Sequence, residues 1–143
     1  MAIVGFNFNR MNAERKGGVK GKINISNNVA IKSIEEHNIS IEKSKQNSLK
    51  FKFEFTSKFE PEIGSITLEG DVLLIEEAKK AKDILDSWKK DKKVPKDVMT
   101  DVLNTILARC NVEAILLSRE ISLPPPIPLP KVDNSTQGKE YIG

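Results

Sequence analysis

The sequence predicts an α+β fold, with an N-terminal antiparallel β-sheet of about four strands or more followed by two helices and a proline-rich extended segment. Apolar and polar residues alternate through the first half of the chain, which is the period of a half-buried strand. All six Phe residues lie at or before position 59, and from residue 76 the apolar spacing changes to three and four, the period of a helix. We expect a single domain over residues 1–130, with strands at about 1–75, helices at about 76–120 and a proline-rich strand at 121–130, then a flexible tail at 131–143.

Composition excludes several classes of protein. The 143 residues are 38% hydrophobic and 30% charged, which is typical of a soluble single domain. One cysteine, Cys110, excludes a disulfide within the chain, and with a single histidine, His37, it leaves no Cys/His cluster for zinc. The opening residues lack the apolar run of a signal peptide, and no segment reaches the ~18 apolar residues of a membrane helix. We therefore expect a cytoplasmic protein without membrane insertion, metal or cofactor.

The strands are predicted from pairs and triplets of alternating apolar residues. The clearest segment is 49–56, where one leucine and three phenylalanines fall on one face and Lys, Lys, Glu and Thr on the other, so we expect a central strand with one solvated face. Segment 65–75 predicts a further strand with a β-bulge at Gly70. Shorter alternations lie at Val4, Phe6 and Phe8, at Ile23 and Ile25, at Val29 and Ile31, and at Ile39 and Ile41.

Two helices are predicted after the strands. The first begins at Glu76 and ends in the lysine-rich segment 89–93, and its apolar residues are Ala78, Ala81, Leu85 and Trp88. The second opens with Pro95 in its first turn. Its apolar stripe is two residues wide on every turn, which indicates burial against a sheet, and it comprises Val98, Met99, Val102, Leu103, Ile106, Leu107 and Cys110. The pattern continues towards Ile121, so the helix is either about 24 residues long or bent near Asn111.

Segment 121–130 holds five prolines, which forbid a helix and favour an extended conformation. Four apolar residues accompany the prolines: Ile121, Leu123, Ile127 and Leu129. A free linker would not need them, so we expect the segment to pack on the body of the protein. The alternative is a stiff spacer that holds the tail away from the domain.

The order of these parts resembles a known family. Segment 94–98, Val-Pro-Lys-Asp-Val, opens the long helix, and segment 118–126, Ser-Arg-Glu-Ile-Ser-Leu-Pro-Pro-Pro, closes it. Over about residues 50–130 this pattern resembles the SecB-type protein-export chaperones, in which a helix begins just after a proline and ends in a polar turn followed by apolar and proline residues. The resemblance implies a SecB-like fold, with a four-stranded antiparallel sheet and its helices on one side, assembled into dimers and tetramers.

The same resemblance implies a noncatalytic chaperone that holds unfolded or nascent polypeptides in apolar grooves without ATP. The apolar residues proposed to contact such clients are Phe59, Trp88, Ile121, Leu123, Ile127 and Leu129. Family members that act in protein transport by docking on the export motor carry an acidic sheet face and a zinc-binding tail. Because this chain is basic at its N-terminal end and has no Cys or His in residues 131–143, we do not expect that docking.

The basic N-terminal segment suggests a second function. Residues 1–22 contain five cationic side chains and a single acid, Glu14. With Phe6 and Phe8 nearby, they supply the cations and aromatic rings that RNA-binding proteins use, so the alternative is an RNA- or ribosome-associated protein. The candidate residues are Arg10, Arg15, Lys16, Lys20 and Lys22.

The sequence does not predict an enzyme. His37 follows two glutamates, but no nucleophile or metal cluster accompanies it, so we expect a surface histidine. Cys110 falls in the apolar stripe of the second helix and is expected to be a small buried hydrophobe. The glycine-rich segment 17–22 lacks the spacing of a phosphate-binding loop and precedes a strand rather than a helix.

Overall fold

A four-stranded antiparallel sheet and two helices make up the computed structural model, which describes residues 2–18, 21–37, 46–130 and 132. The elements are β1 (Ala2–Arg15), β2 (Asn24–His37), β3 (Gln46–Glu60), β4 (Gly64–Glu77), α1 (Ala78–Asp91) and α2 (Lys96–Glu120). The strand order is β1-β4-β3-β2, and each neighbouring pair is antiparallel. The predicted α+β fold is confirmed, with β3 in the centre of the sheet as expected.

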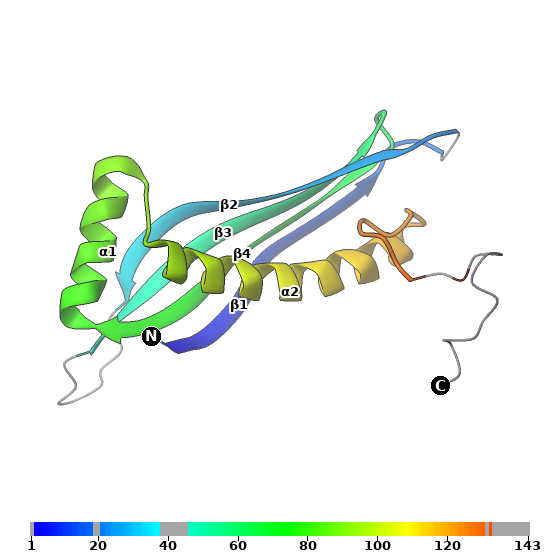
Figure 1. Cartoon of the computed structure of the whole chain (residues 1–143). Coiled ribbons are helices and arrows are strands. Elements are labelled where there is room, and N and C mark those ends of the chain that lie inside the picture. Colours follow the sequence, from blue (N-terminus) through cyan, green and yellow to red (C-terminus); the bar gives the residue numbers. More distant parts are fainter. Residues whose placement is uncertain (1, 19–20, 38–45, 131, 133–143) are drawn as a thin grey trace.

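Both helices lie on one face of the sheet (Figure 1). The alternation in β3 and β4 turns large apolar side chains towards the helices, and these are almost fully buried: Leu49, Phe51, Phe53, Phe55, Phe59, Ile66, Leu68, Val72 and Leu74. Helix α1 follows β4 directly and packs against β2, β3 and β4 at one end of the sheet. Helix α2 then runs back along the sheet and contacts β1, β3 and β4. No described helix is long and apolar enough to cross a membrane.

One predicted helix boundary needs correction, and one open alternative is decided. Helix α1 begins at Ala78 rather than Glu76, because Glu76 is still in β4, where it is buried. The buried residues of α1 are Ala81, Ile84 and Trp88, whereas Ala78 and Leu85 are only half-buried. Helix α2 is a single element of 25 residues, which decides between the two alternatives left by the sequence.

The buried side of α2 is narrower than the sequence predicts. Its buried residues recur every fourth position, as Val98, Val102, Ile106, Cys110, Ala114 and Ser118. Met99, Leu103 and Leu107 were expected in the same stripe but are half-exposed. One line of side chains therefore faces the sheet, and the apolar residues on one side of that line, Met99, Leu103 and Leu107, remain partly open to solvent.

The proline-rich segment is irregular, which corrects the predicted strand at residues 121–130. A turn at Ile121 and Ser122 ends α2, and the chain then folds back over the end of the sheet. Lys20, Ile39, Ile41 and the predicted tail, apart from Val132, lie outside the described residues.

Gly70 allows β1 and β4 to approach closely. The register between these strands shifts between Phe8 and Arg10, so the bulge lies in β1, opposite the glycine, and not in β4 as predicted. A Cβ atom at Gly70 would overlap the carbonyl oxygen of Asn7 and lie 2.9 Å from Phe53 Cζ. The missing side chain lets the Phe53 ring lie over β4 and reach Phe6 on β1, with 5.3 Å between the ring centroids.

We predict that Gly70→Ala destabilises the protein by about 1–3 kcal/mol, because a backbone carbonyl and a packed ring must both move to admit the methyl group. Urea unfolding followed by circular dichroism measures the change. Gly18→Ala is the matched control, since no atom lies within 4 Å of its Cβ position. Equal stability of the two variants would contradict the close approach at Gly70.

Candidate functional site

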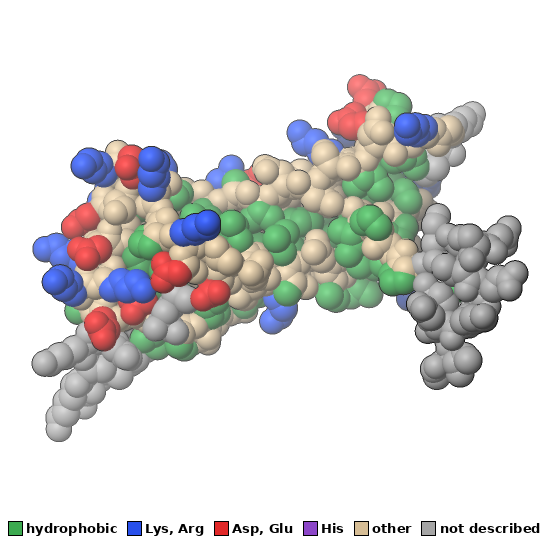
Figure 2. Space-filling model, viewed as in Figure 1, with side chains coloured by type: hydrophobic (Ala, Val, Ile, Leu, Met, Phe, Trp, Pro, Cys, Tyr) green, Lys and Arg blue, Asp and Glu red, His purple; other side chains and the backbone are tan. Residues whose placement is uncertain are grey.

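An apolar surface lies between α2 and the edge strand β2. Arg109 lies 4.8 Å from the centroid of the Phe6 ring, so this flank of α2 faces β1. The opposite flank, which carries Leu103, Leu107 and Ile115, therefore faces β2. Figure 2 shows hydrophobic side chains gathered along the middle of this face, with charged residues crowded at the α1 end.

Strand β2 contributes the other side of this surface. Val29 and Ile31 point to the helix face, are half-buried, and pack on the same core as Leu107. Phe55 of β3 lies opposite Val29 and is fully buried. We name the set Val29, Ile31, Leu103, Leu107 and Ile115 the apolar strip. Sequence analysis missed the β2 members as site residues, and the excess width of the α2 stripe was the available signal for the α2 members.

The proline-rich segment is anchored at one end of the apolar strip. Asn27 Nδ2 donates a hydrogen bond of 2.9 Å to the carbonyl oxygen of Pro126, and Asn27 Oδ1 accepts one of 2.5 Å from Ser57 Oγ. The N–H of Leu123 donates to the Ser118 carbonyl at 2.8 Å, and the Leu123 side chain is only 6% exposed. The expectation that this segment packs on the body of the protein holds for Leu123 and Pro126, which are buried, whereas residues 128–130 are exposed. A polar Asn27 between Ile25 and Val29, on the apolar side of the alternation, was the sequence signal for this anchor.

The predicted client-contacting residues differ in their exposure. Leu129 is 48% exposed and Ile121 and Ile127 are half-buried, so these three offer apolar surface. Phe59 is 1% exposed and belongs to the core. Trp88 is 9% exposed, with Lys92 Nζ 5.1 Å from its ring centroid. Phe59 and Trp88 therefore offer almost no surface to a client, which corrects their proposed role.

An ion-pair network stands at the opposite end, where α1 meets α2. Lys80 Nζ lies 3.4 Å from Asp97 Oδ2 and 3.7 Å from Glu76 Oε2. The backbone N–H of Val98 and then the Lys80 ammonium lower the pKa of Asp97, and Asp97 and Glu76 raise the pKa of Lys80. This network ties the first turn of α2 to α1 and β4. It is solvent-exposed at Lys80 and Asp97, so it positions the helices rather than forming a catalytic group.

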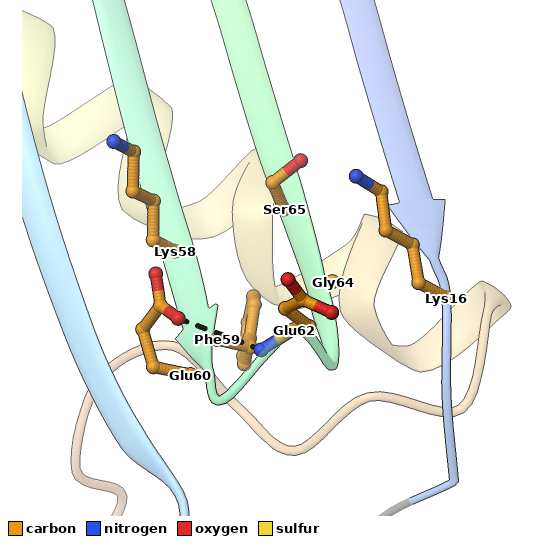
Figure 3. A pocket seen from close by; sticks show the side chains of 7 residues that line it. All are labelled: Lys16, Lys58, Phe59, Glu60, Glu62, Gly64 and Ser65. Atoms are coloured by element: carbon orange, nitrogen blue, oxygen red, sulfur yellow. Dashed lines mark hydrogen bonds between the residues drawn. The ribbon is translucent and has the colours of Figure 1, made fainter.

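The open face of the sheet carries charges of both signs. Ion pairs cross the strands at Arg10–Glu69 (3.6 Å), Lys32–Glu54 (3.7 Å) and Lys52–Glu35 (3.2 Å). At the β3–β4 turn, the pocket in Figure 3 places Lys16 and Lys58 beside Glu60 and Glu62. The described part of this face therefore mixes cations with acids rather than forming a uniformly basic surface.

The residues proposed to contact RNA are not assembled into one site. Arg15, Lys16 and Lys22 are exposed, and Arg10 is paired with Glu69. The two aromatic candidates, Phe6 and Phe8, point to the helix face instead, where their rings meet edge-on at 4.9 Å between centroids. Arg10 pairs with Glu69 on the open face, and Lys16 lies beside Lys58 in the pocket of Figure 3, so these two cations are not next to the Phe6 and Phe8 rings on the helix face.

The candidate catalytic residues lack the surroundings of an active site. Cys110 is fully buried, as expected, and burial raises the pKa of its thiol to about 12, so the reactive thiolate is disfavoured at neutral pH. His37 lies at the end of β2, half-buried, opposite Ser48 of β3. Among the described residues there is no group of His, Cys, Asp and Glu that could hold a metal ion.

We predict that Leu123→Ser lowers the free energy of unfolding by about 2–4 kcal/mol, because it removes a buried side chain and leaves a hydroxyl in its place. Leu129→Ser, in the same segment but half-exposed, should change it by less than about 0.5 kcal/mol. Denaturant unfolding of both variants measures the difference. A packed segment is contradicted if Leu123→Ser is as stable as the parent chain.

Comparison with known proteins supports the fold. No protein-family model matches the chain, and no curated protein matches it. Among solved structures, the Rv1957 SecB-like chaperone of Mycobacterium tuberculosis, in complex with a ChAD peptide from the Rv1956 HigA1 antitoxin, is similar with a TM-score of 0.55. The match covers 93% of this chain and 91% of that one at 10% sequence identity. The chain therefore has an α+β fold consistent with that of SecB-like chaperones.

Proposed function

We propose that this protein is a noncatalytic, SecB-like chaperone that holds unfolded or nascent polypeptides on its apolar strip. The observation that carries the proposal is the half-exposed apolar surface on two facing elements, α2 and β2, on the helix side of the sheet. Exposed apolar surface of this kind marks an interaction site. The similar chaperone Rv1957 was solved with a bound peptide, which supports a polypeptide ligand here.

The chemistry of the strip suits many polypeptides rather than one. Its members are aliphatic and uncharged, and each would contribute on the order of 1–2 kcal/mol when a client covers it. Contacts of this size add up over an extended apolar segment and need no reaction or cofactor. Ile121, Ile127 and Leu129 extend the available apolar surface beyond the anchor at Asn27.

The side of α2 that is turned away from the sheet is a second exposed apolar surface. Val112 and Leu116 lie on the side of α2 that is turned away from the sheet, and they are 58% and 49% exposed. We propose that this side of α2 contacts a second copy in a homo-oligomer, a dimer or tetramer. RNA or ribosome association has less support, because Arg10 and Lys16 do not lie beside the Phe6 and Phe8 rings.

We predict that Leu107→Gln weakens retention of an unfolded client about five- to thirtyfold, since it removes one aliphatic contact from the centre of the strip. The measurement is the dissociation constant for a chemically unfolded protein, with suppression of its aggregation as a second readout. Val4→Gln, which changes a half-exposed apolar side chain on the far edge strand β1, is the control and should bind as the parent does. Equal binding by both variants would rule out the apolar strip.

We predict that the double variant Val112→Glu and Leu116→Glu is a monomer of about 16 kDa, whereas the parent chain is larger, because four or more carboxylates would be brought together in the interface. Multi-angle light scattering at micromolar concentration measures both masses. A parent chain that is already monomeric, or an unchanged mass in the variant, would refute this interface.

A further inference from the structure

Burial repeats every three residues along the first part of the proline-rich segment. Ser122, Pro125 and Pro128 are exposed, whereas Leu123 and Pro126 are buried. A polyproline-II helix has three residues per turn, so it meets a flat surface with every third side chain. The segment therefore lies on the body of the protein along one line and turns a second line, with two of its prolines, to solvent.

Proline chemistry accounts for this conformation. Each proline ring fixes its own φ at about −65° and holds the preceding residue in the extended region. Every residue from 123 to 130 is either a proline or directly precedes one. The chain bends at Pro126 and Ile127, where a proline is followed by a different residue and its own ψ is less restricted. The segment is thus two short stiff pieces joined at one bend.

The second piece projects from a fixed point. Pro128, Leu129 and Pro130 are exposed, and the exposed fraction of Leu129 is 48%. Immediately before the bend, Asn27 Nδ2 donates a hydrogen bond of 2.9 Å to the carbonyl oxygen of Pro126. The protein therefore presents an apolar end that is held at its base and is stiff along its length.

The backbone of this end accepts hydrogen bonds and has almost no donors. Of residues 128–130, only Leu129 has a backbone N–H. Within the part of the chain that the structure describes, no hydrogen bond reaches their carbonyl oxygens. Pairing with a β-strand needs regular donors as well as acceptors, so a strand is not the matching partner. Tryptophan and tyrosine match, because each combines an apolar ring with one N–H or O–H donor.

We propose that residues 127–130, the exposed proline end, dock into an aromatic-lined groove on a folded partner protein. Grooves of this kind recognise polyproline-II segments. Two aliphatic–proline dipeptides, Ile127-Pro128 and Leu129-Pro130, would pack between the rings of the groove, and its indole or phenol donors would bond to the carbonyl oxygens. Since the end is stiff before binding, little conformational entropy is lost on docking. The inference does not rest on the proposed chaperone function, because it needs no unfolded client.

A second copy of the chain does not supply such a groove among its described residues. Trp88 is 9% exposed, and no tyrosine lies in the described ranges. Phenylalanine rings have no donor for a carbonyl oxygen. The occupant to which the proposal commits is therefore a different protein.

NMR titration of isolated polyproline-binding domains with the full-length chain tests the proposal. The probes are an isotope-labelled SH3 domain and an isotope-labelled WW domain, and we expect the chain to shift the groove tryptophan signals of at least one of them. Pro128→Ala combined with Pro130→Ala should weaken that binding at least tenfold, because both rings that enter the groove are lost.

The matched control is Pro124→Ala combined with Pro125→Ala, which replaces two prolines before the bend. It should bind within twofold of the parent chain. Each double variant lacks two prolines, so the two should have equal free energies of unfolding, and a difference in binding is then not a difference in folding.

Three outcomes would overturn the proposal. The first is that neither domain binds the parent chain at millimolar concentration. The second is that the two double variants bind equally, which would place the contact elsewhere in the chain. The third is that Leu107→Gln weakens domain binding and the variant at Pro128 and Pro130 does not. In that case the domain is held on the apolar strip as a client, and the proposed function stands without the docking end.

Discussion

The packing of α2 on the sheet through a single line of side chains determines most of what the molecule presents to solvent. That line runs from Val98 to Ser118 at every fourth residue and is almost fully buried. Its side chains become smaller along the helix, from two valines and an isoleucine in the first half to Cys110, Ala114 and Ser118 in the second. Because only one line is used, a helix of 25 residues rests over β4 and its neighbours, and contact with β2 is left to α1 and to the proline-rich segment.

The aromatic residues explain why α2 lies towards β1. Phe53 crosses over Gly70 to meet Phe6 and Phe8, and Arg109 of α2 lies on the ring of Phe6. Phe6, Phe8 and Phe53 thus lie together on the β1 side, whereas Phe51, Phe55 and Phe59 lie opposite residues of β2. Strand β2 contributes the half-buried aliphatic residues Ile25, Val29 and Ile31 to the same face, with Glu36 beside α1.

Local periodicity made the fold predictable, whereas exposure depended on contacts between distant segments. The alternation around Phe51 and Phe53 and the four-residue spacing after Val98 identified the central strand and the long helix. Glu76 was misassigned because a strand and a helix both accept a glutamate between apolar residues. Nothing local shows that Asn27 holds Pro126, 99 positions away. The bulge opposite Gly70 was placed on the wrong strand because a sequence shows the glycine and not the partner that approaches it.

The two faces of the sheet differ in charge: ion pairs cross the open face, whereas the apolar strip on the helix face has no charged residue. This difference affects which polypeptides can bind. Cross-strand ion pairs such as Lys52–Glu35 keep the open face solvated, while the apolar strip and the outer edge of β2 between Asn24 and Ile31 are both free of charge. Most folded proteins bury runs of alternate apolar side chains in their cores and pair or protect their extended backbone. An unfolded chain exposes both. The apolar strip alone would bind any exposed apolar surface, and the edge of β2 alone would pair with any free β-strand. Because the apolar strip and the β2 edge are adjacent, a client segment must offer both apolar side chains and an unpaired backbone. This requirement distinguishes unfolded chains from folded ones without a chemical step.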